Sequence, residues 1–230
     1  MELADADYSG ADIQIVAAES QCKWLLDYFS NPNNKMKVYK YISSMFFQRE
    51  ITDEEYRDQK AIYHGLNYKL GVKKLANMAG ISEHLAEQLK KFYFSLNPEI
   101  PLWHERLERE IKNKHYVTNI FGRQGWFVDH KDPTLMNKVC AFIPQSSIGD
   151  LINHAIVRIL KADKRIQLLM QVHDSGVFQY PIEYAEECRK NILENMVLDL
   201  PYEPVLRIPA DMKVSRKSYG DTMKVSKLVV

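Results

Sequence analysis

Four side chains suited to binding phosphates and bases recur at helical spacing in one segment. Arg57, Lys60, His64 and Tyr68 are separated by three, four and four residues, so they share one face of a helix. A guanidinium and an ammonium one turn apart can hold a triphosphate, the first as a planar fork and the second as a point charge. A ring on the same face could stack on a base. The alternative is a helix with a solvated basic face, and spacing alone does not exclude it.

Two isolated carboxylates stand where strands are expected to end or turn. Asp7 follows a short strand-like stretch, and Asp174 lies in the turn of an expected hairpin. Carboxylate oxygens are ligands of Mg²⁺, and two such ions can activate an attacking hydroxyl and stabilise a leaving oxygen. Taken alone, each aspartate is typical of a turn. Spacing does not show that residues 167 positions apart meet.

Length and composition are those of a globular protein. The 230 residues suffice for one large domain or two small ones, and 46% of them are hydrophobic, which argues against disorder as the dominant state. No apolar run approaches the ~18 residues of a membrane helix. The N-terminus lacks the basic head of a signal peptide. Three widely spaced cysteines without a CxxC pair favour a reducing compartment. We therefore expect no membrane association and a location in the cytoplasm.

The formal net charge of +1 conceals an uneven distribution. Residues 57–91 hold seven Lys or Arg against three Asp or Glu, and residues 207–227 hold six against two. Residues 183–203 hold two against six. Basic patches can bind phosphates, although solvated helix faces explain the same pattern.

The hydrophobic pattern predicts an α+β chain with strands near both ends and helices between them. Thr52 and Glu55 have capping-box spacing, and Pro98 and Pro101 are expected to break a helix. The expected strands are a stretch from Leu3, residues 116–121, 126–128 and 209–214, and a hairpin over 167–180 with its turn at 173–176. The expected helices run from Asp12 onward and over 38–47, 54–68, 82–94, 102–114, 147–162 and 184–197.

Three motifs resemble, in order, those of family A DNA polymerases, the DNA polymerase I type. Residues 7–14 resemble the first palm motif, residues 60–68 the fingers-helix motif, and residues 171–174 the palm-hairpin motif. Weaker likenesses lie between the second and third motifs, at residues 121–123 and 143–147, and in the tail, at residues 208–213. The resemblance covers nearly the whole chain, and several departures from the family pattern look like those of phage members.

The resemblance implies template-directed DNA synthesis by an antiparallel palm sheet with flanking helices and a mainly helical fingers subdomain. Asp7 and Asp174 are implied to hold two Mg²⁺ ions, with the backbone carbonyl of Tyr8 as a further ligand. The primer 3′-hydroxyl would then attack the α-phosphate of a dNTP and release pyrophosphate.

Further roles follow from the same resemblance. Lys60 and Arg57 are implied to bind the triphosphate, Lys60 also to protonate the leaving pyrophosphate, and Tyr68 to lie beside the nascent base pair. Three residues are implied to touch the primer-template through contacts that read shape rather than sequence; they are Arg123, Gln145 and His173.

The fingers motif departs from the family pattern. Arg57 precedes Lys60 by three residues rather than four, and Tyr56 occupies the position four back. His64 stands where the family has Phe or Tyr, so stacking on the incoming nucleotide depends on an imidazole. Lys69 stands where glycine usually follows.

The palm motifs also depart from that pattern. Ser175 replaces the usual acidic residue after Asp174, so metal binding rests on Asp7 and Asp174.

Asp12 replaces a glutamate that helps the family to exclude ribonucleotides. Because aspartate is one methylene shorter, we expect weaker sugar discrimination than the family norm. Incorporation of rNTP relative to dNTP should fall in Asp12→Glu; equal rejection of rNTPs by the two proteins would count against this role.

The motif order implies a palm formed by residues 1–30 and 126–230 and fingers formed by residues 31–125. In the family, a thumb and an exonuclease-like domain precede this region, whereas Asp7 lies six residues after Met1. The chain is therefore expected to be either one half of a split polymerase or a fragment of a longer one. We expect a partner chain that carries those parts, and apolar surface on the palm sheet to receive it.

Two other classes of protein remain open from the sequence. One is a primer-template or dNTP binder without catalysis, and the other is an α+β interaction protein with chance motifs. Metal-dependent dNTP binding separates the first from the second, and turnover separates an enzyme from both.

Overall fold

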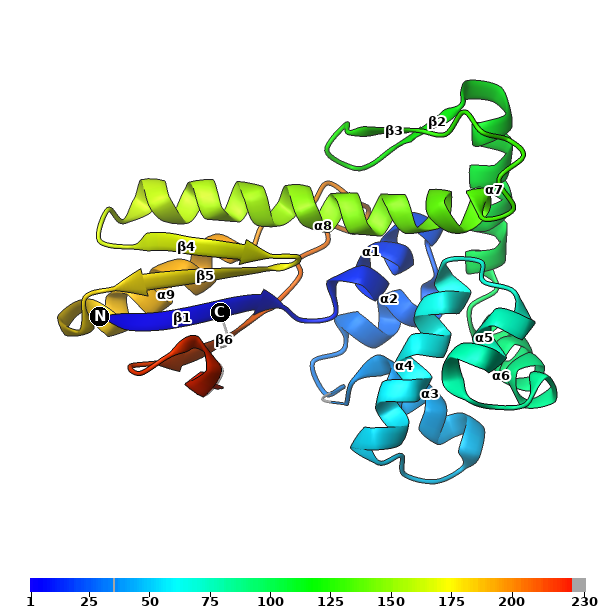
Figure 1. Cartoon of the computed structure of the whole chain (residues 1–230), viewed down its shortest axis with the longest axis horizontal. Helices are drawn as coiled ribbons and strands as arrows, with labels where there is room; N and C mark the ends of the chain where they lie inside the picture. The colour runs from blue at the N-terminus through cyan, green and yellow to red at the C-terminus, as the bar shows by residue number, and fades with distance from the viewer. Residues whose placement is uncertain (35, 225–230) are drawn as a thin grey trace. The chain divides into compact units, whose positions relative to one another are not determined.

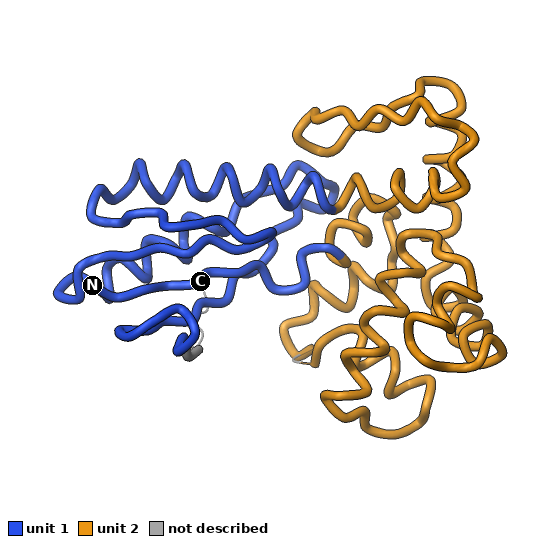
Figure 2. Tube along the Cα trace, viewed as in Figure 1, with its two compact units in different colours: residues 1–12, 145–230 blue, residues 13–144 orange. Residues whose placement is uncertain are grey.

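The chain is described here by a computed structural model, which covers residues 1–34 and 36–224. It divides into two compact units (Figure 2). Unit 1 holds residues 1–12 and 145 onward, and unit 2 holds residues 13–144. The palm and fingers boundaries predicted at residues 30 and 125 do not coincide with these units and stay predictions. Residues 13–30 group with unit 2 because Ile13, Val16, Ala17 and Leu25 are buried in its core. The basic segment 207–227 extends to Lys227, which lies outside the described residues.

Unit 1 is built on an antiparallel sheet with the strand order β4-β5-β1-β6-β7 (Figure 1). Helix α8 (Leu135–Ala162) enters this unit after Pro144. The other elements of unit 1 are β1 (Glu2–Tyr8), β4 (Gln167–Val172), β5 (Ser175–Tyr180), η1 (Ile182–Tyr184), α9 (Ala185–Met196), β6 (Ala210–Ser215), η2 (Tyr219–Asp221) and β7 (Met223–Lys224).

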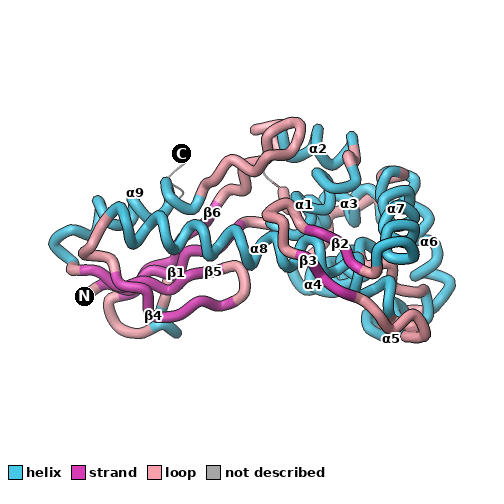
Figure 3. Tube along the Cα trace, turned by 90° about the horizontal axis from the view of Figure 1, so that it is seen from above, coloured by secondary structure: helices cyan, strands magenta, loops and turns pink. Residues whose placement is uncertain are grey.

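The central strand β1 has one packed face and one open face. Ala4, Ala6 and Tyr8 are buried, whereas Asp5 and Asp7 alternate with them on the less buried face, as the period of two in a strand requires. Helix α9 packs along β1 and β6, and Figure 3 shows it alongside the strands. The alternation therefore turns the carboxylates of Asp5 and Asp7 away from the core of unit 1.

The predicted hairpin is present, and its two strands differ in burial. β4 and β5 pair from Gln167–Gln179 to Val172–Ser175, so His173 and Asp174 form the turn. Five of the six residues of β5 are buried, whereas all six of β4 are exposed at the edge of the sheet. The strand β5, next to β1, therefore anchors the turn to the core.

Unit 2 is mainly helical. Its elements are α1 (Ala11–Ser20), α2 (Lys23–Ser30), α3 (Val38–Phe47), α4 (Asp53–Asn67), α5 (Val72–Ala79), α6 (Glu83–Leu96), α7 (Glu99–Lys114), β2 (Tyr116–Thr118), β3 (Gln124–Trp126) and the first part of α8. The capping box predicted at Thr52 and Glu55 is confirmed, with both reciprocal hydrogen bonds in place. The predicted α+β fold, with an antiparallel sheet and a mainly helical second part, is likewise confirmed.

Aromatic rings dominate the core of unit 2. Tyr63 stacks on Tyr39 with 5.4 Å between ring centroids, and Tyr93 lies 5.1 Å from Tyr63. Trp103 of α7 is 2% exposed and joins the same core. Since each such ring buries a large apolar area, these contacts fix α3, α4, α6 and α7 against one another.

Two helices begin earlier than predicted, each with a proline inside it. Helix α7 begins at Glu99, so Pro101 occupies its third position, where the missing N–H has no partner within the helix in any case. Helix α8 begins at Leu135 rather than Ser147 and runs through Pro144. Pro144 removes one hydrogen bond of this long helix, while the buried side chains on either side of it keep the helix continuous.

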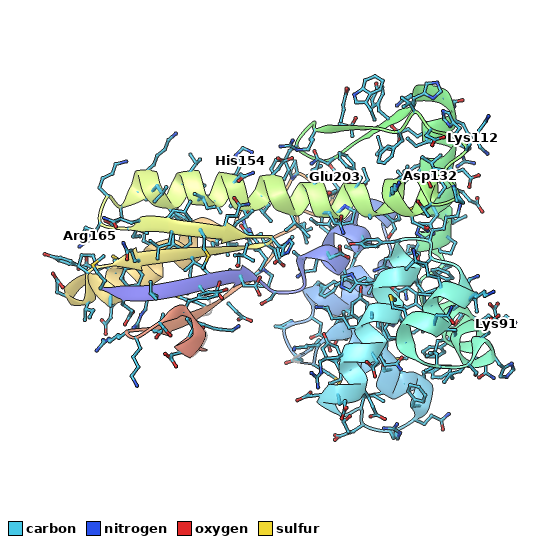
Figure 4. All side chains as sticks on the ribbon, in the orientation of Figure 1. Lys91, Lys112, Asp132, His154, Arg165 and Glu203 are labelled. Carbon is cyan, nitrogen blue, oxygen red and sulfur yellow. The ribbon has the colours of Figure 1, made fainter. Side chains whose placement is uncertain are left out.

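The start of α8 was missed because its signal lies in a turn rather than in a periodic pattern. Asp132, labelled in Figure 4, accepts hydrogen bonds from the Thr134 backbone N–H and from Lys138 Nζ. These contacts hold the pKa of Asp132 at about 2 and order the first turn of the helix.

Two other assignments also change. Strand β2 ends three residues earlier than predicted, and β3 begins two residues earlier at its predicted length, because the Asn119 side chain accepts from the N–H groups of Phe121 and Arg123 and turns the chain early. Helix α5 was not predicted; it is bounded by Gly71 and by Gly80, whose φ is 65°. Over the described ranges, no helix combines the length and apolarity needed to cross a membrane.

Candidate active site

The structure brings Asp7 and Asp174 together in unit 1. Asp7 pairs in register with Ser175, the residue after Asp174, and the Tyr8 N–H donates to the Asp174 carbonyl at 3.4 Å. The Tyr8 hydroxyl donates to the Met196 carbonyl at 2.6 Å and pins this end of β1 to the end of α9. Two carboxylates far apart in the sequence therefore become neighbours at one end of the sheet.

The electrostatics of Asp7 follow from this placement. Partial burial, together with the nearby charges of Asp174 and Asp5, raises the pKa of Asp7 to about 6, against a smaller opposing effect of Lys213. A carboxylate that is desolvated and faces a second carboxylate favours its protonated form. The pair is thus stabilised by any cation that both carboxylates can share.

Three charged residues near this pair, to which the sequence analysis assigned no role, are Asp5, Asp211 and Lys213. Asp211 on β6 lies opposite Asp7, and Lys213 lies opposite Asp5, and directly opposite residues share a face of the sheet. Asp211 also accepts a hydrogen bond of 2.8 Å from Ser9 Oγ. The charged alternation at residues 5 and 7, and at 211 and 213, was the available signal.

The donor set at this end of the sheet fits Mg²⁺. Magnesium usually binds one or two carboxylates and completes its coordination with water and substrate phosphates. Within the part of the chain that the structure describes, no cluster of three or more His, Cys, Asp or Glu could hold a metal, so the side-chain donors here are the carboxylate pair. Carbonyl oxygens such as that of Tyr8 are compatible additional ligands.

The turn that carries Asp174 has an unusual backbone. His173 has φ 52°, in the left-handed region that favours glycine. Its side chain is exposed, whereas Ser175 is buried and donates from Oγ to the Val172 carbonyl at 3.1 Å. Such backbone strain is retained where surrounding structure enforces it, often at functional sites.

In unit 2, the four residues singled out at helical spacing line one pocket of about 390 Å³. Arg57, Lys60 and His64 come from α4, and Tyr68 caps its C-terminal end. Arg57 and Lys60 are exposed, and the His64 ring lies 6.1 Å from that of Tyr68. The pocket thus combines two cations with two rings, a lining suited to an anionic ligand that carries a base.

A buried polar network fixes the end of α4, and sequence reasoning did not find it. The Asn67 side chain donates to the Tyr39 hydroxyl at 2.9 Å and accepts from the Tyr93 hydroxyl at 2.7 Å. His104 Nε2 lies 2.7 Å from the Asn67 carbonyl. The next turn is held by Asn137, whose amide donates to the Tyr68 and Lys69 carbonyls. The position of Tyr68 is therefore set by the buried network at Asn67 and by the partly buried Asn137.

His104 should make the stability of the protein depend on pH. Burial lowers its pKa from 6.5 to about 4, so its stabilising contribution is complete above pH 6.5 and is lost as the pH falls towards 4. Between pH 7 and pH 5 we expect it to remove about 2 kcal/mol of unfolding free energy. In urea titrations, the free energy of unfolding of His104→Gln should fall less between pH 7 and pH 5 than that of the wild type, by about this amount. Equal drops in the two proteins would contradict the assignment.

The backbone conformation at Lys69 favours glycine, the residue that the family resemblance implies after Tyr68. The φ of Lys69 is 59°, which costs an L-residue roughly 1–2 kcal/mol, and its ammonium is held by Glu108 at 2.8 Å. Lys69→Gly and Lys69→Ala both remove this ion pair. The difference between their free energies of unfolding therefore measures the cost of the left-handed backbone conformation at residue 69. We expect Lys69→Gly to be more stable than Lys69→Ala by about 1 kcal/mol in chemical denaturation. An alanine variant as stable as the glycine variant would show that the backbone here is unstrained.

The remaining predicted site residues are dispersed over both units. Asp12 lies in the first turn of α1, Gln145 is exposed on α8, and Arg123 is exposed just before β3. Arg123 follows Gly122, whose φ is 86°, in the turn between β2 and β3. Each unit therefore carries a set of candidate residues, the carboxylates in unit 1 and the cationic pocket in unit 2.

The architecture matches that of a solved polymerase domain. The POL domain of Pol1 from M. smegmatis, in complex with DNA primer-template and dNTP, superposes with a TM-score of 0.82 at 23% identity. The match covers 94% of this chain and 40% of that chain. The fold is therefore that of a polymerase domain.

The family follows from the sequence match. The model of DNA polymerase family A matches residues 1–220, and the chain belongs to this family. DNA polymerase I of Helicobacter pylori is 26% identical over 91% of this chain, and the thermostable DNA polymerase I of Thermus filiformis is 26% identical over 91%. These matches cover 24% and 26% of the relatives, so the chain spans about a quarter of their length.

Proposed function

We propose that the chain is the palm and fingers part of a template-directed DNA polymerase, which adds dNTPs to a primer 3′-hydroxyl. The observation that carries the proposal is the Asp7–Asp174 pair at one end of an antiparallel sheet, in a member of DNA polymerase family A. Unit 1 would then be largely palm and unit 2 largely fingers.

The carboxylates of Asp7 and Asp174 are the proposed ligands of two Mg²⁺ ions. When bound, these ions would supply positive charge that favours ionisation of the primer hydroxyl and offsets charge on the leaving group. The primer oxygen forms a bond to the α-phosphorus of the dNTP, and the bond from that phosphorus to the bridging oxygen of the β-phosphate breaks. The strained turn at His173 keeps Asp174 beside Asp7 while substrates change.

The pocket on α4 is the proposed site for the incoming nucleotide. The Lys60 ammonium and the Arg57 guanidinium bind the triphosphate, and Lys60 donates a proton to the leaving pyrophosphate. His64 and Tyr68 provide flat surfaces for the sugar and base. The network around Asn67 prevents Tyr68 from drifting, and so favours a nascent pair of one shape.

The residues that bind DNA and the partner chain are also proposed from the family resemblance. Arg123, Gln145 and His173 would bind the primer-template, and Asp12 would contribute to sugar selection. A partner chain with thumb and exonuclease-like parts, a phage-like origin and a cytoplasmic location stay predictions. The exposed apolar side chains of β4 are a place where such a partner could bind.

Primer extension tests the function. The purified chain is mixed with a labelled primer-template, four dNTPs and Mg²⁺, and Asp174→Ala serves as the control. We expect template-directed growth that the variant loses. A chain that binds dNTP and primer-template in a metal-dependent way without extending the primer would instead be the non-catalytic binder.

A further inference from the structure

We propose that His115 and His130 form a binding site for a divalent transition metal such as Zn²⁺, which staples the base of the β2–β3 hairpin. The site lies wholly within unit 2 and involves none of the residues assigned to DNA synthesis. Imidazole nitrogen is a good ligand for zinc, copper and nickel, whereas Mg²⁺ prefers oxygen.

The two rings already converge. His115 Nδ1 and His130 Nε2 lie 2.7 Å apart, and the ring centroids are 4.8 Å apart. Both side chains are exposed, so the rings are reachable from solvent and can turn. The charge of the neighbouring Lys114 is engaged by Glu110 at 3.1 Å, which reduces its repulsion of a bound cation.

The spacing of the nitrogens is close to that of a chelating pair. Zinc–imidazole bonds of about 2.0–2.1 Å in a tetrahedral arrangement separate two ligand nitrogens by roughly 3.3–3.4 Å. The pair must therefore open by about 0.6 Å, which small rotations of two exposed side chains provide. Because no third His, Cys, Asp or Glu completes the site within the described ranges, water would occupy the other positions.

The position of the pair gives the metal a structural role. His115 directly precedes β2, and His130 follows β3 by four residues. Each strand has three residues, and a two-stranded hairpin of this size is marginally stable by itself. Its base is held by the Phe127 N–H, which donates to the His115 carbonyl at 2.7 Å, and by Tyr116 against Trp126 at 4.8 Å. A metal bound by the two imidazoles would add a third contact between the ends of the hairpin. It would stabilise the hairpin by closing the loop between His115 and His130.

Calorimetric titration with Zn²⁺ tests the site. The protein carries no polyhistidine tag, and excess Mg²⁺ is present so that the carboxylates of unit 1 do not contribute. The variants are His115→Gln and His130→Gln, and the control is His84→Gln, which removes an exposed histidine of α6. We expect saturable binding of one Zn²⁺, an affinity at least tenfold lower in either site variant, and no change in the control.

Amide hydrogen exchange provides the structural readout. Zn²⁺ should slow exchange in residues 116–126 of the wild type but not in His130→Gln. Zinc binding that survives both site substitutions, or no saturable binding at all, would overturn the metal site. Unchanged exchange in the zinc-bound wild type would overturn the staple. Because both side chains are exposed, the variants should retain the circular dichroism spectrum of the wild type.

Discussion

Asp174→Asn should lower the rate of primer extension by roughly 1,000-fold or more. The substitution removes one of the two carboxylates proposed to hold Mg²⁺, and metal stabilisation of a transition state is worth several kcal/mol. Single-turnover incorporation of one complementary dNTP measures the effect without interference from DNA release. Glu183→Gln, which removes an exposed carboxylate elsewhere in unit 1, should leave the rate within about twofold of the wild type, because it alters neither the pair nor its metals.

The Asp174→Asn variant should not be less stable than the wild type. In the folded protein the pKa of Asp7 is raised to about 6 by burial and by Asp174, so Asp7 destabilises the fold increasingly as the pH rises through 6. Removing the charge of Asp174 relieves part of that cost at pH 7. We therefore expect a free energy of unfolding equal to or above that of the wild type. Lost activity with a matching loss of stability would assign Asp174 to the fold rather than to catalysis.

Lys60→Ala should lower kcat/KM for the incoming dNTP by roughly 100-fold or more. The lysine is proposed to bind the triphosphate and to protonate pyrophosphate, and general acid catalysis alone contributes about 10²–10⁴-fold. Steady-state extension at varied dNTP concentration separates the two effects, since loss of binding raises KM and loss of the proton donor lowers kcat.

Lys91→Ala is the matched control for this experiment. Lys91, labelled in Figure 4, is an exposed lysine on α6 of the same unit and does not line the pocket. Its removal changes the net charge equally. A control variant as defective as Lys60→Ala would attribute the loss to general electrostatics rather than to the pocket.

Local signals in the sequence were sufficient to predict secondary structure where they coincide with a periodic pattern. The capping box at Thr52 predicted the start of α4. The side chains at helical spacing on and after that helix line one pocket; they are Arg57, Lys60, His64 and Tyr68. The turn residues at the hairpin placed Asp174 correctly. Pairing of Asp7 with Asp174 was expected from resemblance alone, because strand order is a long-range property that no local pattern encodes.

Other features of the site could not be read from the sequence for physical reasons. Asn67 resembles any polar residue near a helix end, and its importance comes from two tyrosines and a histidine that other helices supply. Asp211 became relevant only through its register with β1. Pro144 suggested a helix break, whereas packing on both sides of it keeps α8 continuous.

Protection of Lys60 by nucleotide is the most direct test that the α4 pocket binds the incoming dNTP. Lysine acylation is measured by mass spectrometry on the wild type, with and without dNTP and Mg²⁺. If the pocket holds the triphosphate, dNTP with Mg²⁺ should protect Lys60 but not Lys91. Equal labelling of Lys60 with and without dNTP, or equal protection of Lys91, would contradict the account.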